Sequence, residues 1–73
     1  MPKTIRTSEY QRVVDRLKQA RLDIGLTQKE VSEKIKKPQS YISKVEAGEQ
    51  RVDIIELKSF AILYKKSLNY FIL

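Results

Sequence analysis

The sequence contains neither cysteine nor histidine. Their absence excludes disulfide frameworks, the usual zinc sites and every catalytic mechanism that needs a thiol or an imidazole. Among the remaining residues, no nucleophile, base and orienting group fall into a recognisable arrangement. We therefore expect a protein of a reducing compartment that is not an enzyme and that binds no metal and no cofactor.

Long apolar segments are also missing. No run of about 18 apolar residues occurs, so no membrane-spanning helix is predicted. The amino-terminal residues MPKTIRTSEY lack the apolar core of a signal peptide. These absences predict a soluble cytoplasmic protein that does not bind a membrane.

Acidic residues are in the minority. Nine acidic side chains stand against fifteen basic ones, which gives a net charge of +6 and an isoelectric point near 9.7. The 73 residues are enough for one small domain. A basic domain of this size commonly binds a polyanion, although a merely solvated surface can have the same composition.

The few glycines and prolines mark the ends of helices. Gly25 and Gly48 each follow a helical apolar pattern and predict left-handed helix ends, while Pro38 stops one helix and permits the next to begin. The candidate N-caps are Ser8, Thr27, Asp53 and Ser67. We predict an all-α fold of five helices over residues 8–73. Residues 1–7 are expected to be a flexible basic arm, either a disordered terminus or an arm that contacts DNA.

Apolar residues recur at helical spacing in the first and fourth predicted helices. The predicted core stripe of the first comprises Tyr10, Val13, Val14, Leu17, Ala20 and Ile24. That of the fourth comprises Ile54, Leu57, Ala61 and Tyr64. Four further apolar residues, Ile55, Phe60, Ile62 and Leu63, widen the surface of the fourth helix. It is therefore either enclosed or presents a second apolar face to a partner.

Residues 26–48 predict two short helices joined by a tight turn. Thr27 and Glu30 have the spacing of a capping box, and Leu26 and Val31 occupy the positions of a hydrophobic staple. Four positions at one-sided helical spacing are expected to be buried, namely Val31, Ile35, Ile42 and Val45.

A larger pattern joins these features to the following helix. It comprises Leu26-Thr27-Gln28, Ile42-Ser43-Lys44-Val45-Glu46, Gly48, Leu57 and Ala61, with a small residue, Ser32, where two helices cross. This pattern resembles the lambda-repressor-like (Cro-type, xenobiotic-response-element) helix-turn-helix family of transcriptional regulators. The resemblance extends from about Val13 to Ile72 and implies a compact five-helix DNA-binding domain.

The resemblance implies that a recognition helix, about residues 39–46, lies in the major groove of double-stranded DNA. The residues at its base-contacting positions are Gln39, Ser40, Lys44 and Tyr41. An amide suits adenine, an ammonium suits the paired acceptors of guanine, and a hydroxyl is permissive. Tyr41 is expected to contact a thymine methyl group with its ring or a phosphate with its hydroxyl.

The resemblance also implies contacts outside the bases. The candidate phosphate contacts are Gln28, Ser43, Arg51, Lys29 and Lys37, with simple solvent exposure as the alternative for Ser43 and the lysines. For Ser43 a base contact is a further alternative. Gln28 is further expected to brace the first residue of the recognition helix. Arg21 and Glu46 occupy positions that form a partly buried structural ion pair in this family.

Four residues at three places in the chain depart from the family pattern. Lys36 replaces a glycine of a left-handed turn, so the turn either keeps that conformation at a cost on the order of 1 kcal/mol or is reshaped. Pro38 replaces the usual Ser or Thr cap. Lys65-Lys66 replaces a Gly-Val pair that turns the chain before the fifth helix.

One recognition helix reads too few base pairs to find a site in a genome, so we expect a homodimer. The apolar residues of the fifth helix, Leu68, Phe71 and Ile72, either pack back on the domain or pair with another molecule. The expected dimer surface comprises Leu63, Leu68, Tyr70, Phe71 and Ile72. It would set two recognition helices about 34 Å apart on a near-palindromic operator. The predicted function is a repressor, such as a phage repressor or a controller protein of a restriction-modification system. The alternative is an antitoxin-like module that binds a protein through the fourth and fifth helices.

Overall fold

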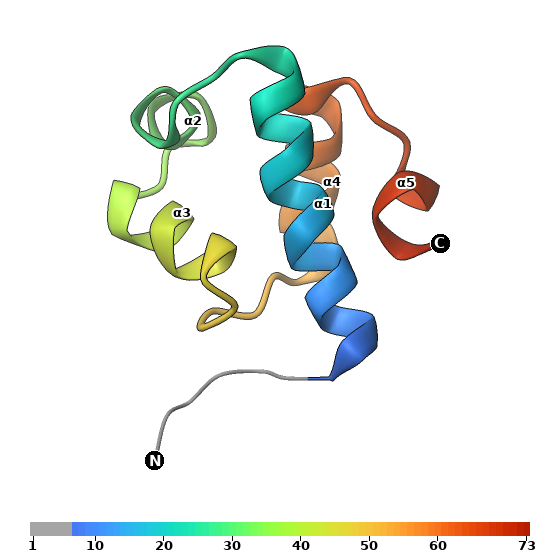
Figure 1. Cartoon of the computed structure of the whole chain (residues 1–73). Helices are drawn as coiled ribbons and strands as arrows, with labels where there is room; N and C mark the ends of the chain where they lie inside the picture. The colour runs from blue at the N-terminus through green and yellow to red at the C-terminus, as the bar shows by residue number, and fades with distance from the viewer. Residues whose placement is uncertain (1–6) are drawn as a thin grey trace.

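The computed structural model describes residues 7–73, and within them the chain forms five helices and no strand (Figure 1). The helices are α1 (Ser8–Ile24), α2 (Gln28–Ile35), α3 (Gln39–Glu46), α4 (Ile54–Tyr64) and α5 (Leu68–Ile72). The all-α prediction is therefore confirmed. Most of the predicted basic arm, residues 1–6, lies outside the described residues.

Each helix begins at a residue that can satisfy its free amides, with one exception. The capping box of α2 is complete: the Thr27 hydroxyl accepts from the Glu30 amide and Glu30 accepts from the Thr27 amide. For α1 the expected cap was Ser8, but the preceding residue, Thr7, accepts from the Tyr10 amide and caps the helix. Thr7 thus belongs to the folded domain and not to the arm. Pro38 precedes α3 without any side-chain cap.

The first four helices end in the same left-handed turn. The residue with positive φ is Gly25, Lys36, Gly48 or Lys65. The amide that follows it bonds back to an earlier carbonyl: Leu26 to Arg21, Lys37 to Ser32, Glu49 to Lys44 and Lys66 to Ala61. Lysine at two of these positions has therefore kept the turn that glycine adopts more easily, and the alternative of a reshaped turn is not realised.

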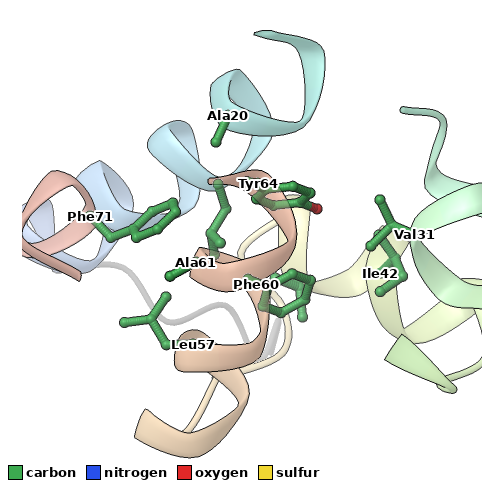
Figure 2. Packing of buried hydrophobic residues seen from close by; sticks show 10 residues of the cluster. Ala20, Val31, Ile42, Leu57, Phe60, Ala61, Tyr64 and Phe71 are labelled. Carbon is green, nitrogen blue, oxygen red and sulfur yellow. The ribbon is translucent and has the colours of Figure 1, made fainter. Parts of the chain in front are cut away.

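The core is built on the inner side of α4, which contributes Leu57, Phe60, Ala61 and Tyr64 (Figure 2). The remaining helices add Val14, Leu17, Ala20, Val31, Ile42, Val45 and Phe71. Two expectations were wrong. Ile54 was assigned to the core but is 61% exposed, whereas Phe71 was assigned to a dimer surface but is fully buried against the core.

The arrangement leaves α3 on the outside. In Figure 1, α2 and α3 lie to one side of the pair formed by α1 and α4, and α5 lies on the other side. α5 is tied to α1, because the Arg12 guanidinium donates to the carbonyl of Leu73 (3.2 Å). Because α3 lies on the outside, it packs on the domain through one side, and its other side can carry polar residues.

Candidate nucleic-acid interface

α3 has one buried and one exposed side. Ile42 and Val45 are buried in the core and fix the orientation of the helix. The opposite side carries Gln39, Ser40, Ser43 and Lys44, all of which are exposed. Residues at this spacing share one face of a helix, so their side chains form a single polar row. The row contains three of the four predicted base-contacting residues.

The surface around α3 is cationic. Between Lys34 and Val45 the sequence has lysines at 34, 36, 37 and 44 and no acidic residue. The first acidic residue after them, Glu46, has a side chain that is only 6% exposed and is paired with Arg21. The sequence contains no histidine that could change this charge near neutral pH. A polyanion therefore meets an attractive surface along this segment.

Glu46 joins α3 to both preceding helices. Arg21 Nε and Nη2 donate to its two carboxylate oxygens at 2.8 and 3.0 Å, and Gln28 Nε2 donates to Oε1 at 3.0 Å. Hydrogen bonding to Glu46 raises the pKa of the Arg21 guanidinium, against the opposing effect of burial, so the guanidinium stays charged. The structure brings Arg21 and Glu46 together as the resemblance implies. Gln28, however, contacts the last residue of α3 and not the first.

A second cluster lies at the start of α3. The Tyr41 hydroxyl donates to Glu56 of α4, and Lys37 Nζ lies 2.9 Å from the other Glu56 oxygen. Lys37 Nζ also lies 5.2 Å from the centre of the Tyr41 ring. Hydrogen bonds from Tyr41 and Lys37 lower the pKa of Glu56, while burial and Glu56 raise the pKa of Tyr41. Tyr41 thus differs from the expectation, because its half-buried side chain is engaged within the protein and not projected from the polar row.

Arg51 lies in the loop between α3 and α4, which Tyr10 of α1 holds in place. The Tyr10 hydroxyl donates to the Gln50 carbonyl (3.3 Å) and accepts from the Val52 amide (3.0 Å). The exposed Arg51 guanidinium lies 5.2 Å from the centre of the Tyr10 ring. A cation over an aromatic face is attracted to it, so Tyr10 limits where Arg51 can point.

Sequence reasoning missed Tyr10 and Glu56 as parts of this region. Tyr10 was read only as a member of the core stripe, and Glu56 was given no role. Their partners lie 40 and 15 residues away along the chain, and no local spacing rule links residues so far apart. The number of tyrosines, four in 73 residues, was the only available hint that hydroxyl groups help to join the helices.

The predicted dimer residues are divided between buried and exposed positions. Leu63, Leu68 and Tyr70 are partly buried against the core, and Ile72 is 53% exposed. Phe71 is fully buried and therefore cannot meet a partner. Ile54 and Leu73 are further exposed apolar residues, at 61% and 71%.

Within residues 7–73, no group of three or more acidic residues is placed to hold a metal ion. Among the helices of that same segment, none is both long enough and apolar enough to cross a membrane.

Comparison with known proteins agrees with the arrangement of α2 and α3. A family model described as helix-turn-helix matches residues 17–71. No curated protein matches the chain. The matched segment includes the capping box, the turn, the exposed row on α3 and the core positions of α4. The chain therefore belongs to the lambda-repressor/Cro-like helix-turn-helix family, whose members are DNA-binding regulatory domains.

Proposed function

We propose that this protein is a transcriptional repressor that inserts α3 into the major groove of double-stranded DNA. The observation that carries the proposal is the exposed row on α3, on a helix whose opposite side is buried. Gln39, Ser40 and Lys44 supply an amide, a hydroxyl and an ammonium to base edges. These groups can distinguish base pairs by their donors and acceptors.

Phosphate contacts would orient the domain on the duplex. Gln28 uses one amide donor on Glu46 and retains a second hydrogen for a phosphate oxygen. Exposed groups at Lys29, Ser43 and Arg51 complete the set. Lys37 is the weakest member, because an ion pair with Glu56 already occupies its ammonium. We assign Tyr41 to positioning α3 and not to base contact.

Two copies of the chain are required for a specific site. The molecule extends 31 Å in its longest direction and has one recognition helix, whereas successive major-groove faces are about 34 Å apart. We propose a two-fold dimer through the exposed Ile72 and the partly buried Leu68 and Tyr70. Phe71 is omitted because it is buried, and Leu63 is omitted because it lines a groove with Lys34 and Lys36, whose charges would repel those of a second copy. The dimer would bind a near-palindromic operator.

The test is selection of bound sequences from random double-stranded DNA at two salt concentrations. We expect a short palindrome and an affinity that falls steeply as salt rises, since phosphate contacts release counterions. Gln39→Ala and Lys44→Ala should each weaken binding to the selected site by about 1 to 3 kcal/mol. Lys18→Ala, which removes an exposed lysine from α1, is the charge-matched control for Lys44→Ala and should leave site preference unchanged.

Equal binding to every fragment would contradict sequence-specific recognition. Sedimentation of the complex separately tests the dimer: a single protein chain on the selected palindrome would contradict two-fold binding while leaving the role of α3 intact.

A further inference from the structure

α4 carries an apolar strip on its solvent side. Ile55 and Ile62 are 67% and 69% exposed and lie seven residues apart with Ser59 between them, so all three share one face. A groove of about 400 Å³ adjoins this face at the carboxyl end of α2. Its lining residues are Lys34, Ile35, Lys36, Ser59, Ile62 and Leu63.

The fold does not require this strip. The inner side of α4 is already filled by Leu57, Phe60, Ala61 and Tyr64, which together with the other helices complete the core. Single exposed apolar residues are common on protein surfaces. Here two isoleucines adjoin a groove to which Ile35 and Leu63 add apolar surface, and such a continuous arrangement is typical of binding surfaces.

The charge around the groove indicates the kind of partner. Lys34 and Lys36 belong to the lining, Lys58 is exposed beside Ser59 on α4, and none of the six lining residues is acidic. In a two-fold dimer through this face, lysines of one copy would approach lysines of the other. Like charges across an interface oppose association, so a second copy of this +6 chain is a poor occupant.

We propose that the groove between α2 and α4 binds an acidic amphipathic helix of another protein. Apolar side chains one turn apart on that helix would pack on Ile35, Ile62 and Leu63, and its carboxylates would face Lys34, Lys36 and Lys58. The groove contains no residue of α3. Its occupant therefore contacts the first helix of the helix-turn-helix without covering the exposed row, and the inference goes beyond DNA binding.

The test uses the full chain and a fluorescent helical peptide with leucines at helical spacing and glutamates on both sides of them. Ile62→Glu should weaken peptide binding by about tenfold or more in fluorescence anisotropy. The matched control is Leu22→Glu, which introduces the same charge at a 52% exposed leucine of α1 and should leave the affinity unchanged. Both side chains are exposed, so circular dichroism should show the same helix content for each variant.

The role of charge is tested by reversing it, first in the groove and then in the peptide. Lys34→Glu should weaken binding of the acidic peptide and should strengthen binding of a peptide in which lysines replace the glutamates. Binding of the acidic peptide should also weaken as salt rises. Equal affinity of the wild type for the acidic and the lysine peptide would overturn the proposal, as would equal losses in Ile62→Glu and Leu22→Glu.

Self-association is the remaining alternative. If Ile62→Glu changes the sedimenting mass of the free protein and leaves peptide affinity unchanged, a second copy occupies the face and the proposal is overturned. DNA affinity, measured on the same variants, should be the same for Ile62→Glu and Leu22→Glu. Wild-type protein that binds DNA but not the peptide would contradict this inference alone, and wild-type protein that binds the peptide but not DNA would contradict the proposed function alone.

Discussion

The two ends of helix α3 are held by different means. At its carboxyl end, Glu46 pairs with Arg21, and their side chains are only 6% and 10% exposed. At its amino end, Tyr41 and Lys37 share Glu56, and the side chains of Lys37 and Glu56 are 41% and 26% exposed. Water and salt weaken the second ion pair far more than the first. Stability should therefore depend mainly on the carboxyl end.

The turns on either side of α3 also differ, and again the amino end is the less firmly held. The chain leaves α3 through Gly48 at a φ of 77° and approaches it through Lys36 at a φ of 61°. A left-handed backbone costs glycine little and costs lysine on the order of 1 kcal/mol. The amino end, where Gln39 and Ser40 face outward, thus combines a strained turn with a weaker ion pair. Its position is more easily altered than that of the carboxyl end.

The largest effect is expected from Glu46→Ala. It leaves the nearly buried Arg21 guanidinium without a counter-charge and should lower the free energy of unfolding by about 3 to 5 kcal/mol. Urea denaturation measures this change. The double variant Arg21→Met with Glu46→Met should lose less, because it removes both charges together. An unchanged melting temperature in Glu46→Ala would show that the nearly buried pair at the carboxyl end contributes no more to stability than the more exposed pair at the amino end.

Glu56→Ala tests the amino end. It removes the partner of Lys37 and the acceptor of the Tyr41 hydroxyl, and should cost about 1 to 1.5 kcal/mol because both contacts are partly open to water. A double-mutant cycle with Tyr41→Phe in urea denaturation isolates the contribution of the hydroxyl. A loss as large as that in Glu46→Ala would show that α3 is held equally at both ends.

Lys36→Gly should stabilise the protein by about 1 kcal/mol, since it relieves the left-handed lysine while the backbone turn is kept. The reciprocal control is Gly25→Lys at the end of α1. No atom lies within 4 Å of a side-chain carbon added there, so only backbone strain should act, with a loss of about 1 kcal/mol. Denaturation midpoints check both. If neither variant changes its denaturation midpoint, a left-handed backbone costs lysine no more free energy than it costs glycine in these turns.

Much of this fold follows from local signals in the sequence. Thr27 with Glu30, Gly25 and Gly48 act within one turn of a helix, so their positions alone predict where α1, α2 and α3 begin or end. The polar row of α3 and the pair of Arg21 with Glu46 required the family resemblance in addition, because the two charged residues lie 25 positions apart. The assignment of bases and phosphates to individual side chains stays a prediction.

The errors have physical causes. α4 is apolar on nearly all sides, so spacing alone cannot tell that Phe60 faces inward while Ile54 faces water. Phe71 was placed on a dimer surface because a five-residue helix shows too little periodicity to indicate its buried side. Tyr10 was read as core although its hydroxyl holds the loop of Arg51, a contact that only the packing of distant segments creates.

The smallest expected effect is the acid dependence of the amino end. Hydrogen bonds from Tyr41 and Lys37 lower the pKa of Glu56 in the folded protein, so the folded state binds its proton less readily than the unfolded state does. The stabilisation is then complete above the unfolded pKa of about 4.3 and is lost as the pH falls through the folded pKa. Glutamine has no ionisable side chain, so the variant Glu56→Gln lacks this pH dependence.

The melting temperature of the wild type should therefore fall more steeply than that of Glu56→Gln as the pH is lowered from about 7 to about 3. Glu30, whose pKa the Thr27 capping box lowers, adds the same dependence to both proteins and cancels in their difference. A difference that stays constant across this range would mean that folding leaves the pKa of Glu56 unchanged and that its contacts do not favour the ionised form. The amino end of α3 would then be held by packing of Tyr41 and not by charge. The contrast between the two ends would be one between side-chain packing and a buried ion pair.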